Sequence, residues 1–339
     1  MLSIKKYVAQ SLSKGVKDLF YRHTFCPVLQ LKIFAILIFL LICAPLLVTT
    51  AMALETIPVE GEPIALALDE KGGRLFSLNY FNKTISVIDE KKLKVVKTIE
   101  LGKRINRNVG TNAILYDSSL GQLLASTGGG EVLIFNGSTL ELTGEIRIDR
   151  FIPDLASDGD FLYLPDWSGD IHKYKDSQAD SVINHGLMAS PYMHMAGNKR
   201  IYLSSGKKGF LVIDAEKGEV VKKLEINALS TPASSNESVF VAGTGKLFVI
   251  NGENLEIEKM IDLDYGNFGG LGLTYNPANA YLYAITANNT VTVVDPNGAG
   301  SIVGKMDVCN RPVALAANKK TGVVYVACPS DEAIAVLKD

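Results

Sequence analysis

Short apolar runs divided by turn residues fill the chain from about residue 54 onward. The stretch 61–101 shows the pattern, with the runs IALAL, RLFSLNY, TISVI and KVVKTIEL separated by turns rich in Gly, Asn, Asp and Lys. Runs of this length, alternating or continuously apolar between such turns, are typical of β-strands. The stretch therefore predicts four strands in succession, and no long helical pattern occurs after residue 54.

The same four-strand unit recurs about every 40 residues, the period of a propeller blade. The first strand of each unit begins just after Pro63, Asn112, Pro153, Pro191, Pro232, Gly270 and Pro312. The third strand ends in an acidic or amide residue, at Asp89, Asn136, Asp176, Asp214, Asn251, Asp295 and Asp339. Both series count seven units, so we predict an all-β fold, a seven-bladed β-propeller over residues 54–339.

The last unit contains three strands before the chain ends. Its fourth strand is expected to come from residues 54–60, because ETIPVEG (55–61) resembles KTIELG (97–102) at the end of the first unit's own fourth strand. We predict that this segment pairs with Ala333–Val336 and closes the ring, which removes an exposed strand edge. Pro58 is compatible with this position, because an outer edge strand tolerates a missing amide donor.

Four stretches resemble the YVTN-type β-propeller repeat, and they are NKTISVID (82–89), GFLVID (209–214), NNTVTVVD (288–295) and GVVYVA (322–327). The repeat places Pro before the first strand, a YV-type second strand and an NTISVID-like third strand. The resemblance implies a seven-bladed propeller. It implies no single activity, since propellers of this type serve as binding scaffolds, surface proteins and subunits of redox enzymes.

A separate N-terminal region precedes the repeats. Residues 1–32 carry several lysines and predict a basic cytoplasmic leader, whereas residues 33–53 are uncharged and long enough to cross a bilayer as one helix. Ala51-Met52-Ala53 fits a signal-peptidase site. A cleaved signal sequence and an uncleaved type II membrane anchor both stay open. Either outcome exports the propeller to the periplasm or the cell surface.

The charge balance narrows the range of partners. The chain has 34 Lys and Arg against 36 Asp and Glu, so no strong field of one sign attracts a polyanion. We therefore exclude nucleic acid, and we expect a protein or glycan partner besides membrane contact through the N-terminal hydrophobic segment.

Strand direction in a blade defines two faces of the propeller. We call top the face with the segments leading into first strands and the turns between second and third strands, and bottom the opposite face. Cys309 lies just before a first strand and Cys328 just after the neighbouring second strand, so both belong at the top of blade seven. In an oxidising compartment we expect them to form a disulfide.

The top face also gathers polar and aromatic residues. We predict that it binds the partner through the following residues: Glu62, Tyr80, Phe81, Asn112, Trp167, Lys207 and Arg311. Trp167 is the single Trp of the chain and sits in a turn between two aspartates. Such an aromatic can anchor a partner or stack on a sugar ring, or it can cover the edge of its own blade.

Two candidate metal sites provide an alternative to this partner-binding interpretation. His185, Met193, His194 and Met195 fall within eleven residues and offer the soft ligands that suit copper. The alternative, which we favour, is that Tyr192–Met195 form part of an inner strand and that their side chains pack between blades. Glu62, Asp154 and His194 could line the channel and hold a divalent cation such as calcium, although propeller lactonases and lyases need more converging acids.

The sequence thus predicts an extracytoplasmic, non-enzymatic propeller that recognises a protein or glycan through its top face. An accessory subunit of a periplasmic redox or metal system is the alternative, and a metal-dependent lactonase-like or lyase-like enzyme is the second alternative. No cofactor is predicted, with copper or calcium as the lesser possibility. No nucleophile triad and no phosphate-binding loop were found in the sequence.

Overall fold

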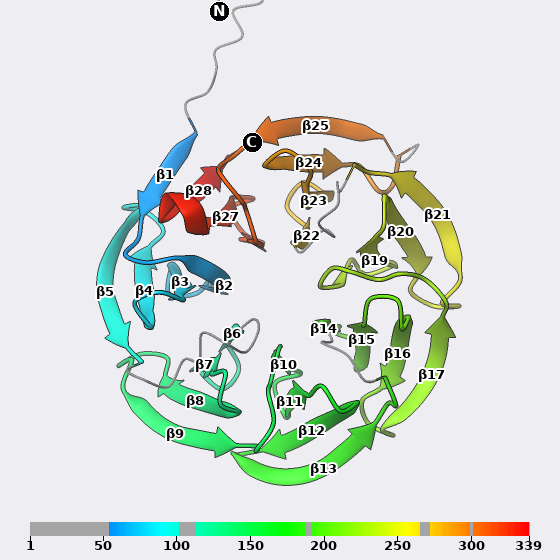
Figure 1. Ribbon diagram of the computed structural model, residues 1–339, viewed down its shortest axis with the longest axis horizontal. Coiled ribbons are helices and arrows are strands. Elements are labelled where there is room, and N and C mark those ends of the chain that lie inside the picture. The colour runs from blue at the N-terminus through cyan, green and yellow to red at the C-terminus, as the bar shows by residue number, and fades with distance from the viewer. Residues whose placement is uncertain (1–53, 102–112, 188–191, 265–271, 299–300, 339) are drawn as a thin grey trace, which may run out of the picture. The chain divides into compact units, whose positions relative to one another are not determined.

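A computed structural model describes residues 54–101, 113–187, 192–264, 272–298 and 301–338 of the chain. In these ranges seven four-stranded antiparallel sheets stand around a central axis as the blades of a propeller (Figure 1). Six blades use four consecutive strands each, running from the axis to the rim. The predicted all-β, seven-bladed architecture is confirmed.

The strand bounds follow the predicted repeat. Blade 1 has β2 (Pro63–Asp69), β3 (Arg74–Asn79), β4 (Thr84–Asp89) and β5 (Lys94–Glu100). Blade 2 has β6 (Ile114–Asp117), β7 (Gln122–Ser126), β8 (Glu131–Asn136) and β9 (Leu142–Arg147). Blade 3 has β10 (Ala156–Ser157), β11 (Leu162–Pro165), β12 (Asp170–Lys175) and β13 (Gln178–Asn184). Blade 4 has β14 (Tyr192–Met195), β15 (Arg200–Ser204), β16 (Phe210–Asp214) and β17 (Glu219–Leu224).

The remaining strands complete the ring. Blade 5 has β18 (Ala233–Ser234), β19 (Ser238–Gly243), β20 (Lys246–Asn251) and β21 (Ile257–Asp262). Blade 6 has β22 (Leu273–Asn276), β23 (Tyr281–Thr286), β24 (Thr290–Val294) and β25 (Ile302–Asp307). Blade 7 has β26 (Ala314–Ala317), β27 (Val324–Cys328), the 3-10 turn η2 (Pro329–Asp331), β28 (Ala333–Leu337) and, as its outer strand, β1 (Glu55–Pro58).

Ring closure occurs through β1, as predicted. β1 pairs antiparallel with β28, from Glu55 opposite Val336 to Pro58 opposite Ala333. Ile57 is fully buried and belongs to a core cluster that spans blades 7 and 1. In Figure 1 the blue β1 accordingly lies beside the red β28.

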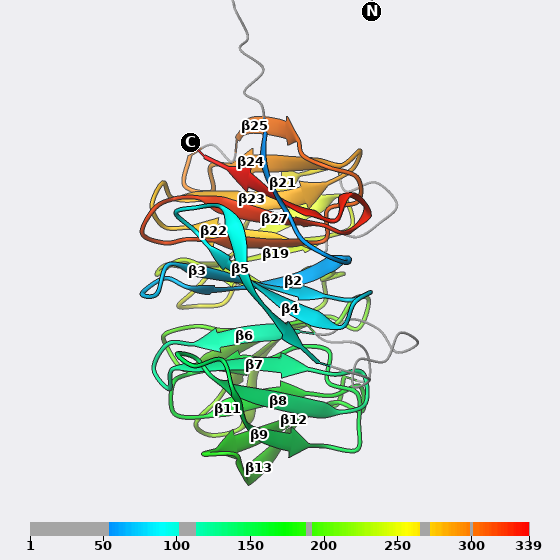
Figure 2. The same cartoon turned by 90° about the vertical axis from the view of Figure 1, so that its left-hand side faces the viewer.

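The core lies between neighbouring blades. The two middle strands of a blade are covered on both faces, so β3 and β4 are buried along nearly their whole length. Only Ile99 of β5 is buried, because this outer strand has one face toward solvent. Figure 2 shows such outer strands, β5 and β9 among them, at the rim of the ring. The continuous apolar runs of second and third strands thus result from their double coverage.

The Asp or Asn at the end of the third strand has a local structural role. Asp89 Oδ1 accepts hydrogen bonds from the backbone amides of Lys91 and Lys92 at 3.0 and 2.9 Å, and Asn136, Asp214, Asn251 and Asp295 repeat the arrangement. A short side-chain acceptor organises such a turn by mimicking a backbone turn. Blade 3 differs, because β12 ends at Lys175 and Asp176 is itself a turn residue with φ 48°.

The N-terminal predictions fall on residues outside the described ranges. The basic leader 1–32 and the hydrophobic segment 33–53 therefore stay predictions. Within the part of the chain that the structure describes, no helix has the length and apolar character needed to span a bilayer.

Candidate binding site at the channel mouth

The top end of the central channel opens into a cavity of about 340 Å³. Every blade contributes to its lining among the described residues, and one lining residue per blade is Glu62, Ile114, Asp154, Tyr192, Thr231, Leu273 and Val313. This convergence follows from the topology, because all seven first strands begin at the same end of the axis. Residues far apart in the sequence therefore share one cavity.

The cavity combines apolar walls with a few charged groups. Its walls come from side chains near the start of the inner strands, including Ile64, Leu66 and Leu315. Glu62 is half-buried and Arg311 is exposed at the rim. Among the described residues, neither side chain forms an ion pair. Apolar walls with a small number of oriented polar groups are the usual composition of a recognition site.

Arg311 is carried by a firmly fixed segment of blade 7. Its backbone has φ 55° and its amide donates to Asn289 Oδ1 at 3.0 Å. Asn310 donates from its backbone and its side chain to the carboxylate of Asp331, at 2.9 and 3.0 Å. The predicted disulfide between Cys309 and Cys328 is present, with Cα atoms 5.9 Å apart. The rim position of Arg311 is thus defined by covalent and hydrogen-bonded links.

Asp154 is a half-buried ionisable group in the lining of the cavity. Its Oδ1 accepts from the amide of Leu155 at 2.8 Å, and its Oδ2 accepts from the amide of Met193 at 2.7 Å. The second bond joins blade 3 to blade 4. Burial raises the pKa of Asp154 to about 7, although both hydrogen bonds act in the opposite direction. Asp154 lies before the short β10, which begins only at Ala156, and it lines the cavity.

The predicted residues of blade 1 form one patch beside the mouth. Tyr80 donates its amide to the carbonyl of Glu62 at 2.8 Å, which ties the β3–β4 turn to the cavity rim. Phe81 follows in this turn with 52% of its surface exposed. Asn112, the remaining residue predicted at the mouth, lies outside the described residues.

Trp167 lies on the same face but outside the cavity, in the turn between β11 and β12. It is 44% exposed, and its ring centroid lies 4.7 Å from that of Phe151. The turn is fixed by Asp166, a fully buried residue that accepts hydrogen bonds from the Ser168 amide and from His172 Nε2 at 2.7 and 3.0 Å. One part of the indole is therefore packed and the other part remains open. Lys207 is exposed in the β15–β16 turn and does not line the cavity.

The predicted copper ligands are spread over different surroundings. His185 follows β13 and is buried, with its Nδ1 accepting from the Leu187 amide at 3.2 Å. His194 pairs with Ser234 Oγ at 2.8 Å, and burial lowers its pKa to about 4. Met193 packs in the core cluster between blades 3 and 4, as the space-filling interpretation expects. Tyr192, by contrast, lines the mouth cavity rather than the interblade core.

Metal binding gains no support from these positions. The described residues include no group of three or more His, Cys, Asp or Glu side chains arranged to hold a metal ion. The copper site formed by His185, Met193, His194 and Met195 and the calcium site in the channel stay predictions.

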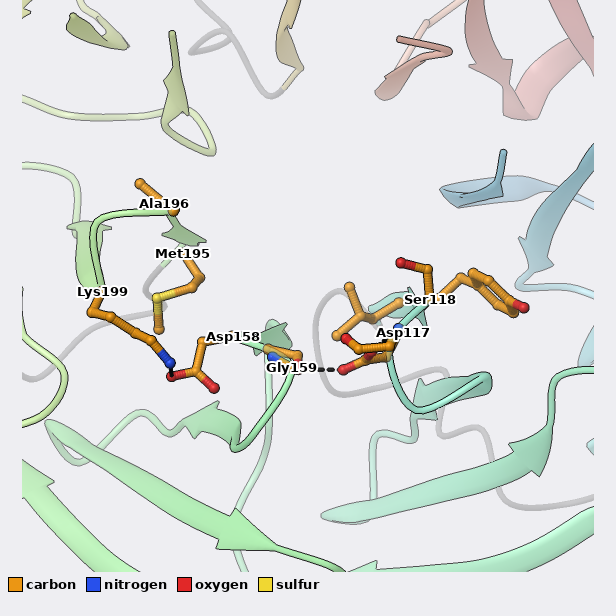
Figure 3. Close-up of a pocket in the computed structure, with 12 residues that line it drawn as sticks. Asp117, Ser118, Asp158, Gly159, Met195, Ala196 and Lys199 are labelled. Carbon is orange, nitrogen blue, oxygen red and sulfur yellow. Dashed lines mark hydrogen bonds and ion pairs between the residues drawn. The ribbon is translucent and has the colours of Figure 1, made fainter. Parts of the chain in front are cut away.

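A second cavity of about 280 Å³ lies on the bottom face, where blades 2, 3 and 4 meet (Figure 3). Its charged groups already have partners: Lys199 contacts Asp158 at 3.1 Å, and Ser157 donates to Asp117 of the neighbouring blade. The sequence pattern does not predict this cavity, because Asp117 and Ser157 are separated by 40 residues. Since its polar groups bind each other, we interpret it as an interblade link and prefer the top cavity as the binding site.

Comparison with solved structures agrees with the fold described above. The chain is similar to the β-propeller domain of Cps50 (Swd1) from Myceliophteria thermophila, with a TM-score of 0.70 and 14% identity, covering 84% of this chain and 99% of that one. It is also similar to hydrazine synthase from Kuenenia stuttgartiensis, with a TM-score of 0.68 and 14% identity, covering 82% and 96%. No family model and no curated protein sequence matches the chain. At this identity the similarity establishes a seven-bladed β-propeller and no activity.

Proposed function

We propose that this protein is a non-enzymatic binding propeller that takes a protein partner on its top face, with the channel mouth at the centre of the interface. The observation that carries the proposal is the cavity lined by all seven blades, in which Glu62 and Arg311 form no ion pair with the other described residues. Charged groups left unpaired around an apolar cavity are available to a partner.

The surroundings of the cavity support a protein partner. Phe81 and Trp167 expose large aromatic surface on the same face. Aromatic residues and Arg are enriched where protein interfaces have their strongest contacts. A glycan that stacks on Trp167 is the other candidate of the same binding class, and the half-open indole is the feature that favours it.

The proposal includes an extracytoplasmic location and membership of the YVTN-type repeat family. The uncharged segment 33–53 and the disulfide between Cys309 and Cys328 support export, since disulfides persist in oxidising compartments. The Pro-led first strands and the NTISVID-like third strands support the family. An accessory role in a redox or metal system is the second candidate, favoured by the cluster of His and Met at 185–195.

Variants with substitutions at exposed positions test the proposal, through a comparison of the partner proteins that each variant enriches. Phe81→Ala and Arg311→Glu remove contacts at the top face, while Met260→Ala removes an equally exposed apolar side chain from the outer strand β21. We expect quantitative mass spectrometry to find the same proteins enriched by wild type and Met260→Ala, and lost with both top-face variants. Equal enrichment by all four proteins would contradict a top-face interface.

A further inference from the structure

A half-buried carboxyl that has no counter-charge among the described residues lines the mouth cavity. Asp154 lines the cavity, and each carboxylate oxygen accepts one backbone amide hydrogen bond. A carboxylate oxygen can accept more than one hydrogen bond, so these two contacts leave acceptor capacity unused. Within the described residues no cation pairs with Asp154. An ionised buried carboxylate is costly unless an opposite charge accompanies it.

The other charged and titratable groups that the structure describes around Asp154 do not supply this opposite charge. Tyr192 and His194 lie on the adjacent β14, and burial keeps both neutral near pH 7, since it raises the pKa of Tyr192 and lowers that of His194 to about 4. Glu62 lines the cavity and adds a second negative group. Arg311 is positive but exposed at the rim and forms no ion pair with Asp154.

We infer that Asp154 receives a cationic side chain, a lysine ammonium or an arginine guanidinium, that a segment of the protein partner inserts into the channel mouth. The inference rests on the proposed function and names the chemistry of its central contact. The ammonium or guanidinium passes the carboxylate of Glu62 and pairs with Asp154. The aliphatic stem of the inserted side chain lies against the apolar walls formed by residues such as Ile64 and Leu315.

The geometry favours a cation over an anion at the depth of Asp154. Both carboxylates of the lining repel an anion, and Arg311 offers its guanidinium only at the rim. A cation at Asp154 also recovers the electrostatic stabilisation that burial removes from the carboxylate, because an opposite charge in a poorly solvated site favours the ionised form. The same contact therefore binds the partner and completes the ionisation of the buried acid.

Small probes test this contact on the full-length protein. N-acetyl-lysine methylamide and N-acetyl-arginine methylamide carry the proposed cations, and N-acetyl-(Nε-acetyl)lysine methylamide and N-acetyl-citrulline methylamide are their neutral counterparts. Binding is measured by calorimetric titration at pH 6 and pH 8. Since an acid with a pKa of about 7 goes from about one tenth to nine tenths ionised in this interval, cationic probes should bind about tenfold more tightly at pH 8. Neutral probes should show no such change.

Variants separate Asp154 from the rest of the surface. Asp154→Asn should abolish the preference for cationic over neutral probes, whereas Met260→Ala, on the outer strand β21, should keep it. If Asp154→Asn does not fold, as judged by circular dichroism, the carboxyl carbon resonance of Asp154 in wild type decides the question. Its apparent pKa should fall when the cationic probe saturates the site.

Equal binding of cationic and neutral probes, or an unchanged pKa of Asp154, would overturn the inference. These outcomes leave the proposed function intact if the Phe81 and Arg311 variants still lose their partner. Loss of the top-face dependence in that enrichment experiment, with normal cation binding, would instead contradict the proposed interface alone. The two failures are thus distinguishable.

Discussion

At Asp154, burial in the channel outweighs the two hydrogen bonds that favour an ionised carboxyl. The folded-state pKa of about 7 lies above the ordinary value of 3.8, so the folded protein binds more protons than the unfolded chain between these values. Stability linked to this group is present at low pH and declines as the pH rises toward the folded-state pKa. The residue therefore works against folding at neutral pH and is suited to a role other than stability.

The first prediction concerns this pH dependence. Between pH 8 and pH 5, wild type should gain up to about 2.6 kcal/mol in free energy of unfolding relative to Asp154→Asn, because only wild type takes up the proton. Urea unfolding at unit pH steps measures the difference. Asp214→Asn is the control: hydrogen bonding to the Lys217 amide lowers the pKa of Asp214, so its linked stability changes only below pH 5. A constant gap between wild type and Asp154→Asn would refute the prediction.

Among the secondary-structure elements, β1 takes part in ring closure, and the segment before β26 takes part in the rim of the cavity. β1 contributes a fully buried Ile57 to the cluster that joins blade 7 to blade 1. The segment before β26 carries Cys309, Asn310 and Arg311 and is linked to β27 and η2. One element closes the fold, and the other positions a rim residue of the cavity.

The second prediction tests β1 by one side chain. Ile57→Ala should lower the free energy of unfolding by about 2–5 kcal/mol, the usual cost of a buried large-to-small change. Val96→Ala on the outer strand β5 is the matched control, since Val96 is 50% exposed, and it should change stability by less than about 0.5 kcal/mol. Similar losses for both variants would mean that β1 contributes no more than an exposed outer-strand position.

The third prediction concerns the disulfide. Replacing Cys309 and Cys328 together by Ser should reduce the free energy of unfolding by about 3 kcal/mol, because the bond closes a loop of 19 residues in the unfolded chain. Urea unfolding measures this loss, and adding a reductant to wild type should reproduce it. A reductant that also destabilises the Ser variant would show that its effect does not come from this bond.

Over the whole molecule, periodic features of the fold were predictable and interblade contacts were not. The strand order and the pairing of residues 54–60 with β28 follow from a repeat in which each blade reproduces the same alternation. The Asp117–Ser157 and Asp154–Met193 contacts join different blades. They depend on the close packing of neighbouring sheets, which the sequence pattern of one blade does not encode. Glu62 and Arg311 could be placed at the mouth because topology alone fixes their end of the axis.

The fourth prediction applies to the ring as a whole. A circular permutant of the propeller begins at Gly61, runs to residue 338 and continues through a three-residue Gly-Asn-Gly turn into residues 55–60. This order places β1 after β28 as an ordinary hairpin. The permutant should be monomeric in light scattering and unfold at the same urea concentration as the unpermuted 54–339 chain, because every strand pair is kept. Deleting residues 54–60 from the latter should instead expose β28 and cause unfolding or association. A stable, monomeric deletion variant would disprove closure by β1.

The pairing of β1 with β28 also orders events during synthesis. The first strand of the propeller to leave the ribosome has no partner until Ala333–Leu337, in the last blade, have followed. A product cut short in its final blade therefore cannot finish the ring, however well its earlier blades have folded. The unpaired segment at its start would mark such a product as incomplete to chaperones and proteases.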